Sequence, residues 1–280
     1  MQDMQSIKHL HRQNRSFLAF AKALIPFNKA ASSSSPMTFS MDSSHVKDFI
    51  IWSRGEPSNW GRQIPPTLFP YWTMPTLVPC LLGRKLALSR MLNGGCKIIQ
   101  KQPLMLDDQF TVRTSLKSIA QLDRFQMVSL QSETRGDGNN LLLETEVRFV
   151  IPNGSKQNAK QSAIDMPPQD KLLGALVAQT DDGFRFACLT GDPNPIHWLT
   201  LWARLFGFKN TILHGFGTLS RSYEHMLTRE LLHRDTVYMN VDFRHPVPLP
   251  SIARLYRDAD RVSVWVDGSP KPSLTGTIHQ

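Results

Sequence analysis

Two ten-residue stretches of the chain, 143 residues apart, resemble each other, which favours a fold of two similar units; a coincidental match is the alternative. Residues 97–106 read Lys-Ile-Ile-Gln-Lys-Gln-Pro-Leu-Met-Leu, and residues 240–249 read Asn-Val-Asp-Phe-Arg-His-Pro-Val-Pro-Leu. Each copy follows an apolar segment and precedes three strand candidates, as expected of a duplicated unit. The 280 residues therefore predict two similar α+β units that are joined near residues 152–170.

Hydrophobic periodicity indicates which segments form strands and helices. Apolar residues at helical spacing predict a helix over 217–232. Residues 41–95, which are rich in proline and aromatic side chains, predict irregular structure. Alternation predicts strands over 110–116, 126–131, 141–150, 237–243, 251–257, 262–266 and 274–278.

The cysteine content and the hydropathy indicate a reduced, folded protein. The chain has three cysteines and no Cys-x-x-Cys pair, which excludes a disulfide-stapled scaffold and argues against a thiolate zinc site. Charged residues make up 20%, too few for a disordered chain. No apolar run approaches the ~20 residues of a membrane-spanning helix. We therefore expect a cytoplasmic protein with no membrane span.

The formal net charge of +9 favours anionic partners, which include nucleic acid, membrane surfaces, phosphorylated cofactors and acidic carrier proteins. The basic residues are spread along the chain, and no nucleic-acid-binding motif is found, so no nucleic-acid partner is expected. Residues 1–40 hold five Lys or Arg, seven Ser and one acidic residue. They predict a basic N-terminal helix and a serine linker, with a mitochondrial targeting segment as the alternative.

A rigid turn presents the residues best suited to chemistry. Two prolines and a glycine in Gly191-Asp-Pro-Asn-Pro195 exclude regular helix or strand, and the turn presents Asp192, Asn194 and His197 within six positions. A carboxylate and an imidazole held this way can share and polarise one water. The alternative is a structural Asx turn beside a packing histidine. One Asp and one His fall short of the usual ligand count, so no metal is expected.

The second element is His214-Gly215, just before the predicted helix. Unpaired backbone N–H groups and the helix dipole at such a position stabilise a developing oxyanion. Glycine there allows close approach of a substrate. The alternative is an ordinary glycine at a helix start.

The stretch around both elements resembles the hydratase motif of the MaoC-like (R)-specific enoyl-CoA hydratase/dehydratase family. That motif reads aromatic, two residues, aliphatic, Ser/Thr, Gly, Asp, one residue, Asn, Pro, aliphatic, His, five residues, Ala. Ten positions fit it: Phe186, Leu189, Thr190, Gly191, Asp192, Asn194, Pro195, Ile196, His197 and Ala203. Residues 203–208 and His214-Gly215 extend the resemblance.

The resemblance implies a double hot-dog fold, in which each unit wraps an antiparallel sheet around a long helix. The expected division is a basic segment over 1–40, a first unit over 41–155, a linker over 156–170 and a MaoC-like unit over 171–280. The offset of 143 places Phe49 opposite Asp192 and Arg54 opposite His197. The first unit is therefore expected to lack the acid–base pair and to receive an acyl tail.

The resemblance also implies a function in fatty acid metabolism. Asp192 and His197 would hold the water that adds to a trans-2-enoyl thioester of coenzyme A or acyl carrier protein, giving an (R)-3-hydroxyacyl thioester, or would remove it in reverse. The Gly215 N–H would hold the thioester oxygen, and Asn194 would support the loop. No cofactor is implied. Alternatives are a thioesterase and a non-catalytic acyl-binding or partner subunit.

Two further residues are expected to contact the substrate. His214 precedes the oxyanion glycine, and Phe216 stands where methionine is common in the family, which narrows the pocket. The exposed sheet edges of hot-dog units favour a homodimer.

Overall fold

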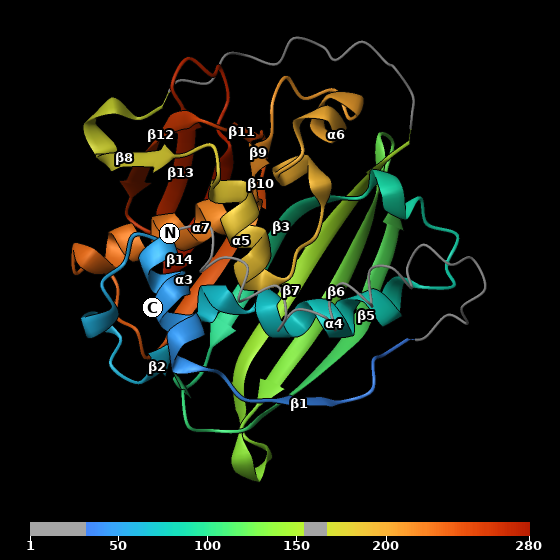
Figure 1. The fold of residues 1–280 in the computed structure, drawn as a ribbon, viewed down its shortest axis with the longest axis vertical. Helices are drawn as coiled ribbons and strands as arrows, with labels where there is room; N and C mark the ends of the chain where they lie inside the picture. The colour runs from blue at the N-terminus through green and yellow to red at the C-terminus, as the bar shows by residue number, and fades with distance from the viewer. Residues whose placement is uncertain (1–31, 154–166) are drawn as a thin grey trace.

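Ten strands form one antiparallel sheet whose two halves come from the two halves of the chain (Figure 1). The structure is a computed structural model that describes residues 32–153 and 167–280. The first five strands, in sheet order, are β1 (Met37–Phe39), β5 (Phe110–Gln121), β6 (Phe125–Arg135), β7 (Leu141–Pro152) and β3 (Leu92–Gln100). The next five are β10 (Val237–Phe243), β14 (Leu274–His279), β13 (Arg261–Val266), β12 (Ser251–Asp258) and β8 (Leu172–Ala178).

The two halves meet at β3 and β10, the strands that carry the repeated pattern. Lys97 of β3 pairs with Asn240 of β10, and these are the matching first positions of the two copies. Outward from this seam, the order β3-β7-β6-β5-β1 of the first half matches the order β10-β14-β13-β12-β8 of the second half. Each half also has a small two-stranded sheet: β2 (Gln63–Ile64) with β4 (Leu104–Met105), and β9 (Ile212–Leu213) with β11 (Val247–Pro248). The predicted duplication and α+β class are confirmed.

Four helices cover one face of the sheet (Figure 1). They are α3 (Ser43–Trp52) and α4 (Pro70–Leu81) from the first half, and α5 (Asp182–Thr190) and α7 (Gly215–Thr228) from the second. The helix expected over 217–232 is α7, which starts two residues earlier and ends four residues earlier, at Thr228, just before Glu230 with its positive φ of 57°. The described residues also form short 3-10 turns: η1 (Pro57–Asn59), η2 (Pro66–Leu68), η3 (Leu88–Arg90), η4 (Asp137–Asn139), η5 (Gln169–Lys171) and η6 (Pro195–His197).

The expectation of irregular structure over 41–95 is wrong, because this segment contains α3 and α4. An interior proline costs a helix about 3 kcal/mol, and α4 contains Pro75 and Pro79. Tertiary packing outweighs this cost, since Trp72, Leu77 and five other α4 residues are buried. The helix therefore forms although its local sequence opposes it.

The correspondence between the two halves also differs from the expected one. The end of α3 and η1 match the end of α5 and η6 at an offset of 138, which places Arg54 opposite Asp192 and Asn59 opposite His197. The offset of 143 fails here because the connections differ in length. Only residues 60–62 separate η1 from β2, whereas residues 198–211 separate η6 from β9. The first half still lacks an acid–base pair at these positions.

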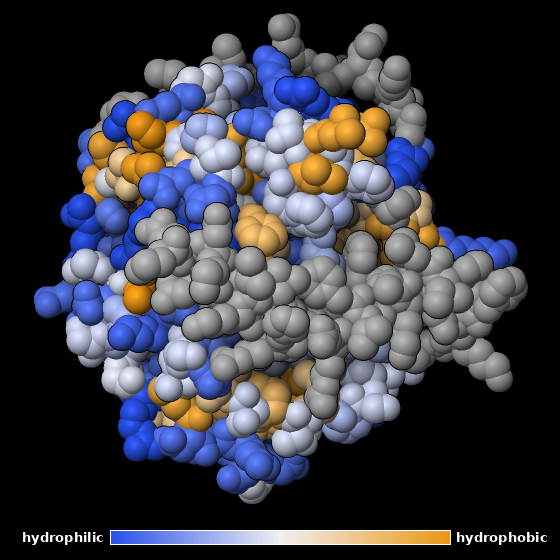
Figure 2. Space-filling view, viewed as in Figure 1, coloured by the Kyte–Doolittle hydropathy of each residue, from blue (hydrophilic) through white to orange (hydrophobic). Residues whose placement is uncertain are grey.

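The longer connection carries α6 (Thr200–Leu205), a short helix on the surface. Figure 2 shows hydrophobic side chains exposed over this part of the molecule. In the first half, the residue after η1 is Trp60, which is 3% exposed, whereas the residue after η6 is Trp198, which is 41% exposed.

Two predicted segments fall largely outside the described residues. These are residues 1–31 of the N-terminal segment and residues 156–166 of the linker. Among the helices of the described residues, none is long and apolar enough to cross a membrane.

Candidate active site

The turn after α5 is built by its own polar side chains. Gly191 ends α5 in the left-handed conformation, with φ of 76°, which glycine adopts without steric cost. An Asp192 side-chain oxygen accepts a hydrogen bond from the Asn194 N–H (3.2 Å), and the Asn194 side-chain oxygen accepts one from the Ile196 N–H (3.3 Å). Asn194 thereby caps η6, and the capped turn holds the His197 side chain near the Asp192 side chain.

The tautomer of His197 follows from its surroundings. Its Nδ1 lies 2.8 Å from the Ile212 carbonyl oxygen, which can only accept, so Nδ1 carries the proton and Nε2 is left as an acceptor. Burial lowers the pKa of His197, opposed by the Asp192 carboxylate and the bond to Ile212. The neutral imidazole is therefore the dominant form at neutral pH, and its Nε2 is ready to take a proton.

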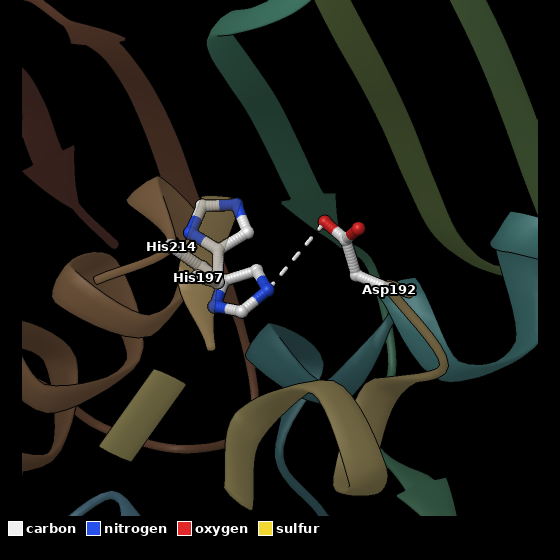
Figure 3. A group of neighbouring side chains, drawn as sticks. All are labelled: Asp192, His197 and His214. Carbon is white, nitrogen blue, oxygen red and sulfur yellow. Dashed lines mark ion pairs between the residues drawn. The ribbon is translucent and has the colours of Figure 1, made fainter. Parts of the chain in front are cut away.

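His214 stacks on His197, with ring centroids 3.5 Å apart and planes at 23° (Figure 3). Its Nε2 lies 3.8 Å from an Asp192 carboxylate oxygen, and its other face contacts the Phe186 ring at 4.7 Å. Neither ring nitrogen has a hydrogen-bond partner among the described residues. Burial, and then the neighbouring His197, hold the pKa of His214 well below its usual range. The site thus contains two neutral imidazoles beside one carboxylate.

Potential ligand atoms of Asp192, His197 and His214 lie within 4.8 Å of one another, a spacing that a metal ion could bridge. Imidazole binds a metal in the plane of its ring. The two stacked planes are nearly parallel, and one ion at bonding distance cannot lie in both. This arrangement suits a hydrogen-bonded water better than a metal ion.

Gly215 is the first residue of α7, and no side chain caps this end of the helix. The N–H groups of a first helical turn have no partner within the helix. A Cβ on Gly215 would lie 2.5 Å from the ring of Phe243. The Phe243 ring packs where a side chain at this position would lie, and the predicted role of Gly215 toward a substrate stays a prediction.

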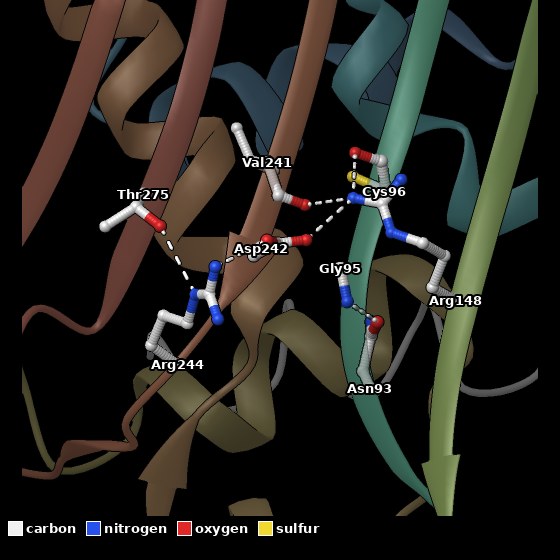
Figure 4. Close-up of polar contacts among 8 residues, drawn as sticks. All are labelled: Asn93, Gly95, Cys96, Arg148, Val241, Asp242, Arg244 and Thr275. Carbon is white, nitrogen blue, oxygen red and sulfur yellow. Dashed lines mark hydrogen bonds and ion pairs between the residues drawn. The ribbon is translucent and has the colours of Figure 1, made fainter. Parts of the chain in front are cut away.

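The strand that carries Phe243 is anchored across the seam of the sheet (Figure 4). Arg148 of β7 reaches over β3 and donates to the Val241 carbonyl oxygen (2.7 Å) and to the Asp242 carboxylate (3.1 Å). The Arg148 side chain crosses β3 next to Gly95, where the register between β3 and β7 shifts. Arg244 donates to the other Asp242 oxygen at 2.8 Å. These contacts fix the end of β10 against which α7 begins.

Phe216, which was expected to contact the substrate, is 2% exposed. Its ring meets Phe69 of the first half at 5.1 Å and Phe243 at 5.6 Å, both edge-to-face. These contacts place Phe216 in the core between the halves, and its predicted role toward a substrate stays a prediction.

Sequence reasoning missed Gly183 and Ile212. A Cβ on Gly183 of α5 would clash with the His197 carbonyl oxygen, so this glycine allows η6 to lie directly on α5. A glycine inside a helical segment was the available signal for close packing. Ile212 orients His197 through its backbone carbonyl, which any residue supplies, so its side chain gave no signal.

Comparisons with known proteins agree with this architecture. Residues 156–263 match the model of the MaoC like domain. The 3-hydroxyacyl-thioester dehydratase X of Mycobacterium tuberculosis is 27% identical over 205 residues, which are 70% of this chain and 70% of that protein.

Solved structures show the same fold. The crystal structure of HtdX from Mycobacterium tuberculosis has a TM-score of 0.73 at 23% identity and covers 88% of this chain and 99% of its own. A second Mycobacterium tuberculosis protein, described as having a double hotdog fold, has a TM-score of 0.52 at 12% identity and covers 90% and 96%. The chain therefore has the double hot-dog fold, and residues 156–263 of its second half are similar to the MaoC like domain.

Proposed function

We propose that the protein catalyses the reversible addition of water to a trans-2-enoyl thioester, with a 3-hydroxyacyl thioester as the product. The observation that carries this proposal is the acceptor Nε2 of His197, which is buried beside the Asp192 carboxylate and whose ring stacks on His214, the residue before α7. A neutral imidazole, a carboxylate and unpaired helix N–H groups are the groups that this reaction needs.

In the hydration direction, Asp192 and His197 hold one water. The water oxygen forms a bond to Cβ of the substrate, and the Cα–Cβ double bond becomes a single bond. His197 Nε2 takes the proton that the water loses, and the acid–base pair then returns a proton to Cα. Dehydration runs through the same steps in reverse, so the protein itself is unchanged after each turnover.

Attack at Cβ moves negative charge onto the thioester oxygen. In this proposal the Gly215 N–H donates to that oxygen, and the positive end of the α7 dipole adds to the stabilisation. A donor of this kind contributes about 10²–10³-fold to the rate. Asn194 acts on the reaction through the turn that it caps, without touching the reacting atoms.

The thioester class is supported by the comparisons, since the M. tuberculosis relative is named a 3-hydroxyacyl-thioester dehydratase. The carrier is coenzyme A or acyl carrier protein. Both are anionic, and the net charge of +9 favours each of them. The proposed reaction belongs to fatty acyl metabolism.

The test follows the absorbance of the enoyl-thioester band with purified protein and trans-2-enoyl-CoA substrates of several chain lengths. Loss of absorbance without release of free thiol supports hydration. Release of thiol, detected with a thiol-reactive dye, identifies a thioesterase instead. If neither enoyl-CoA nor enoyl-carrier-protein reacts at any chain length, the proposal is overturned in favour of a non-catalytic acyl-binding protein.

A further inference from the structure

Six large apolar side chains protrude beside the candidate active site. They form what is called here the α6 patch: Trp198, Leu199, Leu201, Trp202, Leu205 and Phe206. Leu201 is 69% exposed and Leu205 is 72% exposed, the two largest values among the exposed large hydrophobic residues of the described part of the chain. Figure 2 shows hydrophobic atoms gathered on the surface over α6. Soluble proteins rarely expose so many neighbouring apolar side chains without a partner.

The α6 patch belongs to the segment that the second half has and the first half lacks. The first half makes the same connection with residues 60–62, and its Trp60 is buried against Tyr223. The duplicated fold therefore does not need residues 198–211 for its core. Their apolar side chains are an addition at the surface, directly after His197.

The segment is held firmly, so its apolar side chains stay outside. Ala203 is fully buried and attaches α6 to the body of the protein. Thr200 donates to the Asn210 side-chain oxygen (3.4 Å), and the Asn210 amide donates to the Leu249 carbonyl oxygen (2.6 Å). These bonds fix both ends of the segment while the leucines and tryptophans face the solvent.

The charged residues within the segment of the α6 patch, residues 198–211, are positive. Arg204 and Lys209 lie within or next to the segment and are exposed, and no acidic residue occurs between Asp192 and Glu224. Leucine and phenylalanine that enter the acyl boundary, tryptophan at the headgroup level and flanking cations are the composition of a surface that binds an anionic bilayer. The net charge of +9 adds to this attraction.

We infer that the α6 patch docks the protein onto the surface of an anionic lipid bilayer. The leucines and Phe206 enter the boundary between headgroups and acyl chains, and Arg204 and Lys209 contact lipid phosphates. His197, which directly precedes the α6 patch in the chain, is then held near the membrane. This inference does not depend on the proposed reaction, since docking requires no turnover.

The test uses the full chain and sedimentation with phosphatidylcholine vesicles that contain or lack phosphatidylglycerol. We expect binding to the anionic vesicles, and weaker binding as the salt concentration rises. The double variant Leu201→Gln/Leu205→Gln should lower the partition coefficient at least tenfold. The matched control is Ile252→Gln, which changes another exposed apolar residue, 46% exposed, on β12 and should leave binding unchanged.

Fluorescence supplies a second readout. Of the six tryptophans, only Trp198 and Trp202 are substantially exposed, while each of the other four is at most 7% exposed. Anionic vesicles should therefore shift the emission to shorter wavelength, and Trp198→Phe/Trp202→Phe should abolish the shift. Thermal unfolding and gel filtration check that each variant is folded.

Three outcomes would overturn the inference. The first is a wild-type protein that binds no vesicles. The second is binding that the double leucine variant leaves unchanged. The third is a wild-type dimer that the double variant converts to a monomer without any effect on vesicles, which assigns the α6 patch to a second copy of the chain.

Discussion

The rings of His197 and His214 stack at 3.5 Å, so His214 forms one wall of the space around the proposed base. His214 is 2% exposed, and its Nε2 lies 3.8 Å from the Asp192 carboxylate, beyond hydrogen-bond distance. Its contribution is therefore to keep water away from one face of His197, and this exclusion is part of the burial that lowers the pKa of His197.

His214→Ala should raise the pKa of His197 toward its usual value of about 6.5. The variant leaves a cavity beside His197 that water can enter, which reduces the cost of charging the ring. The base works when neutral, so the acid limb of kcat/KM for hydration should move to higher pH. His214→Phe retains a ring in the stack and should shift the limb less. Equal profiles for all three proteins would show that His214 does not tune the base.

Asp192→Asn and His197→Ala should each lower the turnover of enoyl-CoA by ~10²–10⁴-fold, the usual contribution of an acid–base group. The two groups act on the same water, so the double variant should lose little more than either single variant. Turnover is measured from the enoyl-thioester absorbance, and the melting temperatures test whether the fold is intact. Folded variants with wild-type rates would contradict the proposed roles.

Gly215→Ala should lower kcat by about 10²–10³-fold. The new methyl group lies 2.5 Å from the Phe243 ring, so the start of α7 must move, and with it the proposed N–H donor. The informative control is the double variant Gly215→Ala/Phe243→Leu, which makes room for the methyl group. Recovery of at least tenfold in kcat would support displacement of the donor. A fully active Gly215→Ala would rule out a role for this N–H.

Most of the second half was readable from the sequence, because its patterns are local. Strand alternation predicted β10, β12, β13 and β14 within a residue or two, and the paired prolines after Gly191 predicted the turn that holds Asp192. The repeat identified β3 and β10 as equivalent strands, and the structure pairs them with each other.

What could not be read depends on contacts between distant residues. The two interior prolines of α4 oppose a helix, and only burial against the sheet explains why it forms. A single offset could not align the two halves, because the connection over residues 198–211 is longer than the equivalent connection over residues 60–62. The stack of His197 on His214 and the Phe243 ring against Gly215 bring together parts of the chain that no local pattern connects.

A buried acid far from the proposed chemistry gives a pH dependence of stability. Glu224 of α7 is 2% exposed, accepts a hydrogen bond from the Trp60 indole N–H at 3.2 Å and lies against Gly55. Burial raises its pKa from about 4.5 to about 8, opposed by the bond to Trp60 and by Arg234. Between these two values the folded protein keeps a proton that the unfolded chain has lost. The contribution of Glu224 to stability is thus complete below pH ~4.5 and is lost as the pH rises to about 8.

Glu224→Gln should remove this part of the pH dependence. Glutamine retains the oxygen that accepts from Trp60 but carries no charge at any pH, so the variant should be more stable than the wild type at pH values near and above 8. The expected change in slope is at most about 1.4 kcal/mol per pH unit. The measurement is the free energy of unfolding in urea from neutral pH upward, where the buried histidines no longer titrate. Glu230→Gln, which alters an exposed carboxylate just after α7, is the matched control and should follow the wild type. Parallel curves for Glu224→Gln and the wild type would mean that Glu224 ionises in the folded protein as easily as in the unfolded chain.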